Sequence, residues 1–110
     1  MAKYLYRLQY TQSGLEGTVK EGFRARERFF RKTVRNLGGT TKAAYWAYGD
    51  EDVFIVVDLP EAEAATGLAL ALALTGSFRV TTTPLLTAKE MDAGAKKMPA
   101  YRAAGTSTGG

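Results

Sequence analysis

The chain of 110 residues contains no cysteine and no histidine. The absence of cysteine excludes disulfide bonds, a thiol nucleophile and metal sites built on thiolates. The absence of histidine excludes Ser-His-Asp chemistry and most zinc or haem ligation. Any catalysis would therefore have to use Asp, Glu, Lys, Tyr or a cofactor, and we predict neither a bound metal nor a bound cofactor.

Long hydrophobic runs are also missing. The most apolar stretch, GLALALALTG at residues 67–76, is shorter than the about 20 residues that a membrane-spanning helix needs. Strand-like residues begin at Lys3, with no apolar segment of a signal peptide before them. We therefore expect a cytoplasmic protein without membrane contact, and the length suits a single domain.

The basic excess is confined to one segment. The chain has 15 Lys and Arg against 11 Asp and Glu, and the whole excess lies between residues 15 and 37. Such a stripe is most often a solvated helix face. The sequence signature that RNA-recognition domains carry on a central strand is absent from residues 52–59, where two aspartates would repel phosphates. Nucleic-acid binding is therefore not expected. On a helix the basic stripe comprises Lys20, Arg24, Arg28, Arg31 and Arg35.

Hydrophobic periodicity and turn residues predict four strands and three helices. Ser13 and Glu16, and later Thr87 and Glu90, have the spacing of a capping box, which satisfies free backbone N–H groups where a helix begins. We assign residues 1–98 to one domain and residues 99–110 to an arm or flexible tail. The predicted strands are 3–10, 41–48, 52–59 and 77–83, and the predicted helices are 13–37, 61–75 and 87–98.

This order is β-α-β-β-α-β with an extra C-terminal helix. Right-handed crossovers place the first and third strands side by side in the centre of the sheet and both long helices on one face. The sequence therefore predicts an α+β protein with the ferredoxin-like sandwich fold.

The alternating leucines of residues 67–76 would give the helix two apolar faces. Leu68 and Leu72 point one way, while Leu70 and Leu74 point nearly opposite. A helix in a two-layer domain needs only one apolar face, so the other must be covered by the first or third helix or by a partner subunit. We favour the partner subunit.

The strand at 52–59 supports self-association, because it is apolar on both sides between its aspartates. A sheet face of this kind is too large an apolar patch for a soluble monomer. We therefore expect a homodimer or a higher homo-oligomer, resembling a dimeric α/β-barrel. Its predicted interface residues are Phe54, Val56, Leu70 and Leu74.

The segments YWAYGDED and VFIVVDLP, at residues 45–60, resemble the GYD-domain family of small bacterial and archaeal proteins. KYLYRLQYT, the LGG after the first helix, TGSFRVTTTPLLT and MPAYR are similar to the same family, so the resemblance covers residues 1 to 102. It implies a ferredoxin-like fold, usual association as dimers or higher oligomers, and no established activity or catalytic residue. Of the Gly-x-Tyr-Asp pattern, Gly49 and Asp52 are present, but Glu51 stands in place of the tyrosine.

A candidate anion site follows from the parity of the first and fourth strands. If their polar faces coincide, Arg7, Gln9, Arg79 and Thr81 lie together on the open face of the sheet, with Asp58 as a counter-charge. Two arginines in a partly dry cavity can clamp a carboxylate or phosphate. The alternative is a network of salt bridges between subunits, or simply solvated charge.

Three further groups have both a functional and a structural interpretation. Trp46, with Tyr45 and Tyr48, is a candidate to line a pocket for a flat ligand, although such residues more often belong to a core or interface. The acidic residues 50–52 could hold Mg²⁺, but such a turn is usually only solvated. Arg26, inside the apolar arc of the first helix, suits an interface ion pair or a side chain that extends to solvent.

The balance of these observations favours a non-enzymatic binding or assembly module for a small anionic or aromatic ligand. The alternative is a cofactor-independent enzyme of the dimeric α/β-barrel type, a monooxygenase, isomerase or decarboxylase that works by orienting a reactive substrate. A trimeric signalling protein of the same topology is a third hypothesis.

Overall fold

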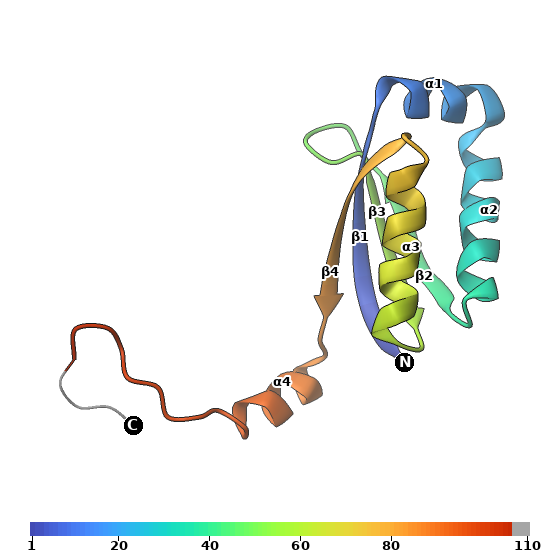
Figure 1. Ribbon diagram of the computed structural model, residues 1–110. Helices are drawn as coiled ribbons and strands as arrows, with labels where there is room; N and C mark the ends of the chain where they lie inside the picture. The colour runs from blue at the N-terminus through green and yellow to red at the C-terminus, as the bar shows by residue number, and fades with distance from the viewer. Residues whose placement is uncertain (107–110) are drawn as a thin grey trace.

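The computed structural model describes residues 1–106 and contains one four-stranded antiparallel sheet with the strand order β2-β3-β1-β4. Figure 1 shows the arrangement of the elements. The prediction of a ferredoxin-like α+β fold with the first and third strands in the centre is confirmed. The elements are β1 (Ala2–Tyr10), α1 (Gln12–Glu21), α2 (Phe23–Asn36), β2 (Thr40–Trp46), β3 (Val53–Leu59), α3 (Ala62–Leu74), β4 (Phe78–Leu85) and α4 (Ala88–Ala95).

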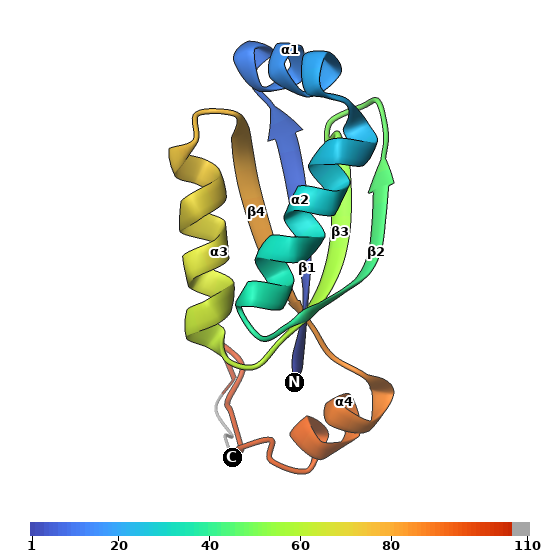
Figure 2. The same ribbon diagram turned by 90° about the vertical axis from the view of Figure 1, so that its right-hand side faces the viewer.

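Helices α2 and α3 lie side by side over one face of the sheet, and no element of residues 1–106 covers the other face (Figures 1 and 2). Burial alternates along β3, because every second side chain points toward the helices. The core between the layers contains Tyr4, Tyr6, Leu8, Val34, Val53, Ile55, Val57, Leu59 and Leu68.

The prediction of one helix over residues 13–37 is wrong. Gly22 has φ +106° and separates α1 from α2, so the chain turns and α1 lies across the end of the sheet (Figure 1). A backbone angle of this kind is readily adopted only by glycine. Because α1 leaves the sheet, Leu15 and Val19 are exposed, and Lys20 no longer shares a helix with the other members of the basic stripe.

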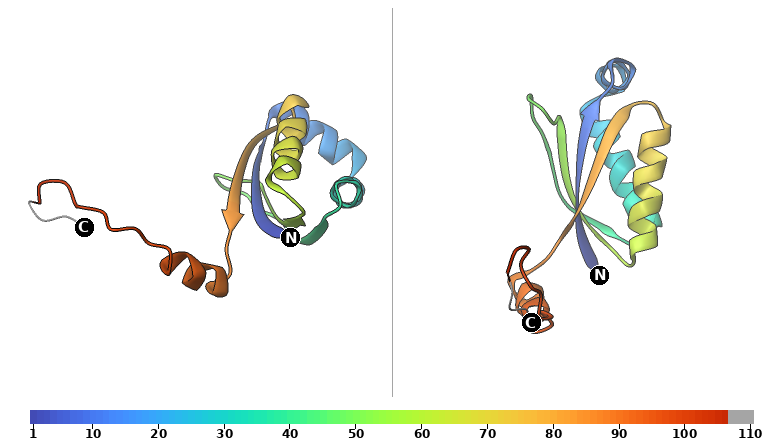
Figure 3. Two further views of the ribbon diagram at one scale, coloured as in Figure 1. Left: turned by 60° about the horizontal axis from the view of Figure 1, so that its bottom comes forward. Right: turned by 60° about the vertical axis from the view of Figure 1, so that its left-hand side comes forward.

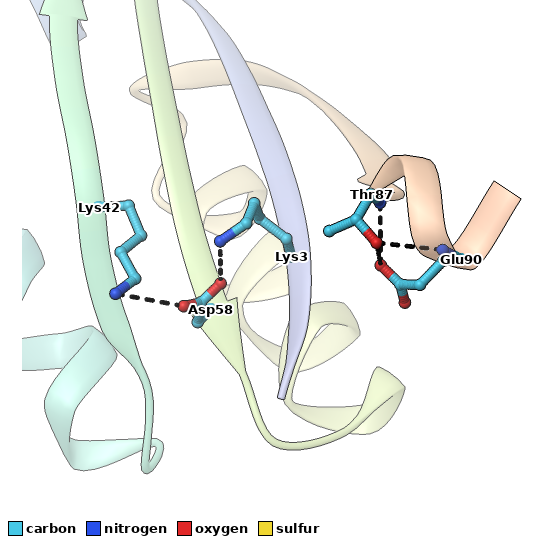
Figure 4. Close-up of polar contacts among 5 residues, drawn as sticks. All are labelled: Lys3, Lys42, Asp58, Thr87 and Glu90. Atoms are coloured by element: carbon cyan, nitrogen blue, oxygen red, sulfur yellow. Dashed lines mark hydrogen bonds and ion pairs between the residues drawn. The ribbon is translucent and has the colours of Figure 1, made fainter.

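The predicted capping box at Ser13 is also wrong, because α1 begins earlier. Thr11 is the N-cap, and its hydroxyl accepts a hydrogen bond from the Gly14 N–H at 3.1 Å. The Glu16 side chain instead accepts a hydrogen bond from Gln12. The second predicted box is confirmed: the Glu90 N–H donates to the Thr87 hydroxyl, and the Thr87 N–H donates to the Glu90 carboxylate (Figure 4).

The leucines of α3 point in two directions, as predicted. Leu68 is 2% exposed in the core, whereas Leu70 and Leu74 are 58% and 85% exposed. No helix of the described chain covers this outer row, so the interpretation in which the first or last helix hides it is wrong.

Both edge strands are irregular. On β2 the pairing with β3 shifts register between Thr41 and Ala43, which leaves Lys42 in a bulge. On β4 the strand continues through Pro84 to Leu85, past the predicted end at Thr83. A proline is tolerated there because β4 is an edge strand, where one side of the backbone has no partner strand.

After β4 the chain leaves the body as a C-terminal arm, residues 86–106, every one of which is exposed. The radius of gyration is 18.0 Å, whereas a compact chain of this length has about 13 Å. Helix α4 ends at Ala95, before the predicted end at residue 98. Residues 107–110 of the predicted tail lie outside the described residues. Among residues 1–106, no helix combines the length and the apolar character needed to cross a bilayer.

Two glycines of α1 provide a matched test of this packing. A Cβ at Gly14 would lie 2.1 Å from the backbone oxygen of Ser77, whereas a Cβ at Gly17 would meet nothing within 4 Å. We expect Gly14→Ala to lower the free energy of unfolding by about 2 kcal/mol through overpacking. We expect Gly17→Ala to raise it by about 1 kcal/mol through helix propensity. Urea unfolding followed by circular dichroism checks both, and equal effects would contradict the close approach of α1 to the start of β4.

Candidate functional site

The open face of the sheet brings together the polar residues that parity predicted. In the strand register Arg7 lies opposite Thr81 on β4 and Phe54 on β3, and Gln9 lies opposite Arg79. These side chains therefore share one face, away from α2 and α3. Leu5, Phe54 and Val56 lie on the same face and are half-buried, so the face has an apolar centre with polar side chains beside it.

Arg7 occupies the central strand of this face and is incompletely satisfied. Its Nε atom is buried and has no hydrogen-bond partner among residues 1–106. An unpaired buried donor is costly, and a guanidinium favours bidentate pairing with a carboxylate or phosphate. An acceptor supplied from outside this chain would therefore be stabilised here.

Asp58 is not the counter-charge of Arg7, which corrects the prediction. Its carboxylate accepts a hydrogen bond from the Lys3 ammonium at 2.7 Å and forms an ion pair with Lys42 at 3.5 Å (Figure 4). Lys3 lies opposite Asp58 in the register, whereas Arg7 lies four residues further along β1. That separation is about 13 Å along a strand. The hydrogen bond from Lys3, reinforced by the charges of both lysines, lowers the pKa of Asp58 despite its partial burial.

Trp46 lies on the opposite side of the sheet from the arginines, because it pairs with the core residue Val53. Its indole N–H donates to the Tyr10 hydroxyl at 3.1 Å, and its ring meets the edge of Phe23 at 6.1 Å between centroids. Tyr45 and Tyr48 are exposed and do not join it. The six predicted ligand-binding residues therefore do not form one site.

Trp46 instead contributes to a cavity of about 180 Å³, which we call the helix–sheet cavity. The sequence did not indicate it, because it arises where α2 and α3 fail to meet over the sheet. Ala44 and Ala71 are among its lining residues, and their small side chains leave space there. The sequence alone does not show which residues surround these two alanines. The other lining residues are Leu8, Tyr10, Arg26, Glu27, Phe29, Phe30, Thr33, Thr41, Val53, Ile55, Leu68, Leu72, Thr75 and Phe78.

The acidic turn has a structural use for one of its members. The Asp52 carboxylate accepts a hydrogen bond from the backbone N–H of Tyr10 at 2.9 Å, and the Asp52 N–H donates to the Leu8 carbonyl. Asp52 thus satisfies backbone groups at the end of β1. Within residues 1–106, no group of three or more acidic, histidine or cysteine side chains is placed to hold a metal ion.

The lowered pKa of Asp58 predicts the pH dependence of stability. A carboxylate with a lowered pKa in the folded state stabilises the fold above its unfolded pKa of about 3.9 and loses that contribution as the pH falls below it. We expect Asp58→Asn to destabilise the chain at pH 7, with a difference from the wild type that narrows below pH 4. Urea midpoints from pH 7 to pH 2.5 measure this, with Asp50→Asn as the control for an exposed turn carboxylate. A difference independent of pH would contradict the Lys3–Asp58–Lys42 interaction.

Comparisons with known proteins give one positive result. No curated protein and no solved structure matches the chain. The family model described as "GYD domain" matches residues 4–95, from the central strand β1 to the last residue of α4. The match spans most of the chain and agrees with the resemblance seen in the sequence, so this chain belongs to the GYD domain family.

Proposed function

We propose that this chain is an assembly module, in which copies associate through the open sheet face and the C-terminal arm and enclose a small anion. The observation that carries this proposal is the arm. It leaves the body on the side of the sheet opposite α2 and α3 (Figures 1 and 3), and all of its residues are exposed.

The arm has the composition of a docking segment. Leu86, Met91, Met98 and Tyr101 are all more than half exposed, and none of them belongs to the hydrophobic core of the described chain. Helix α4 has eight residues, whereas isolated helices shorter than about 12 residues are marginal in water. Its capping box helps it to begin, but packing must supply the remaining stability. A second copy of the chain that packs against the open face would lie on the same side of the sheet as the arm, and it could supply this packing.

The sheet face has the anatomy of an interface. Leu5, Phe54 and Val56 form an apolar centre, and the Lys3–Asp58–Lys42 cluster lies toward one end. Charged residues at the rim and apolar residues at the centre are typical of protein interfaces. Two such faces packed together would be about 10 Å apart, close enough for their side chains to interdigitate.

Arg7 and Arg79 give the enclosed space a positive character. Arg79 and Thr81 are exposed in the single chain, and Arg7 has its unpaired Nε beside them. Desolvation by a second sheet would strengthen their attraction for a carboxylate or phosphate. The outer row of α3, Leu70 and Leu74, is a second apolar surface that would extend a dimer to a larger assembly.

The oligomeric state tests the assembly. We expect the wild type to be a dimer or larger at micromolar concentration in light scattering coupled to size exclusion. Phe54→Arg should lower the mass to that of a monomer, because it places a charge in the apolar centre. For a chain truncated after Leu85, we expect a dissociation constant of the assembly at least tenfold higher than that of the wild type. Tyr48→Arg, in the exposed β2–β3 turn, is the control for an added arginine.

The contrary outcomes are specific. A monomeric wild type would overturn the proposal. Dissociation by Leu70→Arg with no effect of Phe54→Arg would assign the interface to α3 rather than to the sheet and would also overturn it.

Inorganic phosphate tests the enclosed anion. We expect native mass spectrometry to show phosphate retained by the assembly, and Arg7→Gln to weaken its binding at least tenfold, since a charge-assisted hydrogen bond is worth about 1.5 to 3 kcal/mol. Arg28→Gln, on the exposed surface of α2, is the matched control. Equal phosphate binding by wild type and Arg7→Gln would contradict a role of Arg7.

A further inference from the structure

We propose that the helix–sheet cavity binds a small, uncharged, single-ring aromatic molecule that carries one hydrogen-bonding group, the chemistry of a phenol. This inference goes beyond the proposed assembly and does not depend on it, because the cavity lies on the helix side of the sheet. Figure 2 shows α2 and α3, the two helices that bound it, in front of the strands.

The size of the cavity suits one ring. Its volume is about 180 Å³, and an apolar cavity of about 150 Å³ in a protein interior stays dry and binds benzene. The walls are chiefly aliphatic and aromatic, with Leu8, Val53 and Ile55 on the sheet side and Leu68 and Leu72 on α3. Such walls gain dispersion contacts when an apolar molecule fills the void.

Aromatic side chains come from four elements around the same space: Tyr10 from β1, Phe30 from α2, Trp46 from β2 and Phe78 from β4. Ring edges and faces offer a flat aromatic ligand offset or edge-to-face contacts, which add specificity beyond apolar burial. An aliphatic ligand of the same volume would fill the cavity without these contacts.

Thr41 supplies the polar contact. It lines the cavity and is 8% exposed, and its hydroxyl oxygen has no hydrogen-bond partner among residues 1–106. The other two threonines of the lining, Thr33 and Thr75, donate their hydroxyls to carbonyls of Phe29 and Leu72. A buried hydroxyl without a partner is costly, so a ligand that hydrogen-bonds to Thr41 is favoured over one that cannot.

The charged residues of the lining favour a neutral ligand, because they are already paired. Glu27 accepts a hydrogen bond from Arg31 at 2.9 Å. Arg26 pairs with Glu21 at 3.4 Å, and its guanidinium lies 4.8 Å from the centre of the Phe29 ring. A charged ligand would therefore have to lose its water without gaining a free partner of opposite charge.

Access is provided between the helices. Phe29 on α2, Ala71 on α3 and Thr75 at the C-cap of α3 line the cavity and are exposed in the described chain. The ligand can therefore enter without unfolding of the core, with the Phe29 side chain at the entrance.

Phenol and benzene are the probes for the test. We expect both to bind the wild-type chain, with phenol about fivefold tighter, the effect of one net hydrogen bond. Thr41→Val, which replaces the hydroxyl by a methyl group, should reduce phenol affinity to that of benzene. Thr82→Val is the matched control, because the Thr82 hydroxyl is also buried and unpaired but lines a different pocket. It should leave both affinities unchanged.

A second variant and a spectroscopic measurement keep the test independent of the folding of Thr41→Val. Ala44→Leu fills the cavity from β2 and should abolish binding of both probes while raising the thermal midpoint. In amide NMR spectra of the wild type, phenol should shift signals of the cavity lining and not those of β4 around Thr81.

Three results would overturn the proposal: no binding of either probe at millimolar concentration, an undiminished preference for phenol in Thr41→Val, or tighter binding of benzoate than of phenol. The last would show that the site recognises charge.

Discussion

Helices α2 and α3 cover one face of a four-stranded sheet, and the described chain contains nothing to cover the other. The attachment of α3 depends on β1 at the centre of the sheet. Tyr6 is fully buried there, and its hydroxyl donates to the Ala65 carbonyl on α3 at 2.6 Å. Burial, with a smaller contribution from Tyr4, raises the pKa of Tyr6 to about 12. The phenol therefore remains a hydrogen-bond donor over the whole physiological range.

This one-sided cover separates two kinds of chemistry. On the helix side, the helix–sheet cavity is lined chiefly by apolar side chains, and the Thr41 hydroxyl in its lining has no partner among residues 1–106. On the open side, Arg7 lies beside an apolar centre, and its Nε has no hydrogen-bond partner in the part of the chain that the structure describes. The first arrangement suits a neutral ring, and the second suits an anion and a second protein surface. The sheet keeps them apart.

The sequence predicted much of the fold because its hydrophobic periods are clear. The apolar run of β3 and the capping box at Thr87 both have local causes, and both could be predicted from the sequence. The break at Gly22 could not, because a glycine inside a helical pattern is compatible with either continuation or a turn. In the folded chain α1 packs with Gly14 close to Ser77, a contact between residues far apart in the sequence that no local pattern reveals.

The features of the candidate sites likewise divide into those that the sequence could predict and those that it could not. Strand parity placed Arg7, Gln9, Arg79 and Thr81 on one face correctly, since a period of two is fixed by the backbone. Parity could not show that Lys3 and Lys42 engage Asp58, nor that Trp46 faces the helices. Both depend on the register of β3 against its neighbours. The cavity was invisible to sequence reasoning because it is set by the distance between two helices.

The irregular edge strands limit how copies of this chain can combine. An exposed edge normally invites another strand to add by backbone hydrogen bonds, which leads to open-ended sheets and fibres. Here the bulge at Lys42 interrupts one edge, and Pro84 removes an N–H donor from the other. Both irregularities therefore discourage the addition of further strands along the sheet, so that the apolar surface left uncovered on its open face is not extended by open-ended growth from either edge.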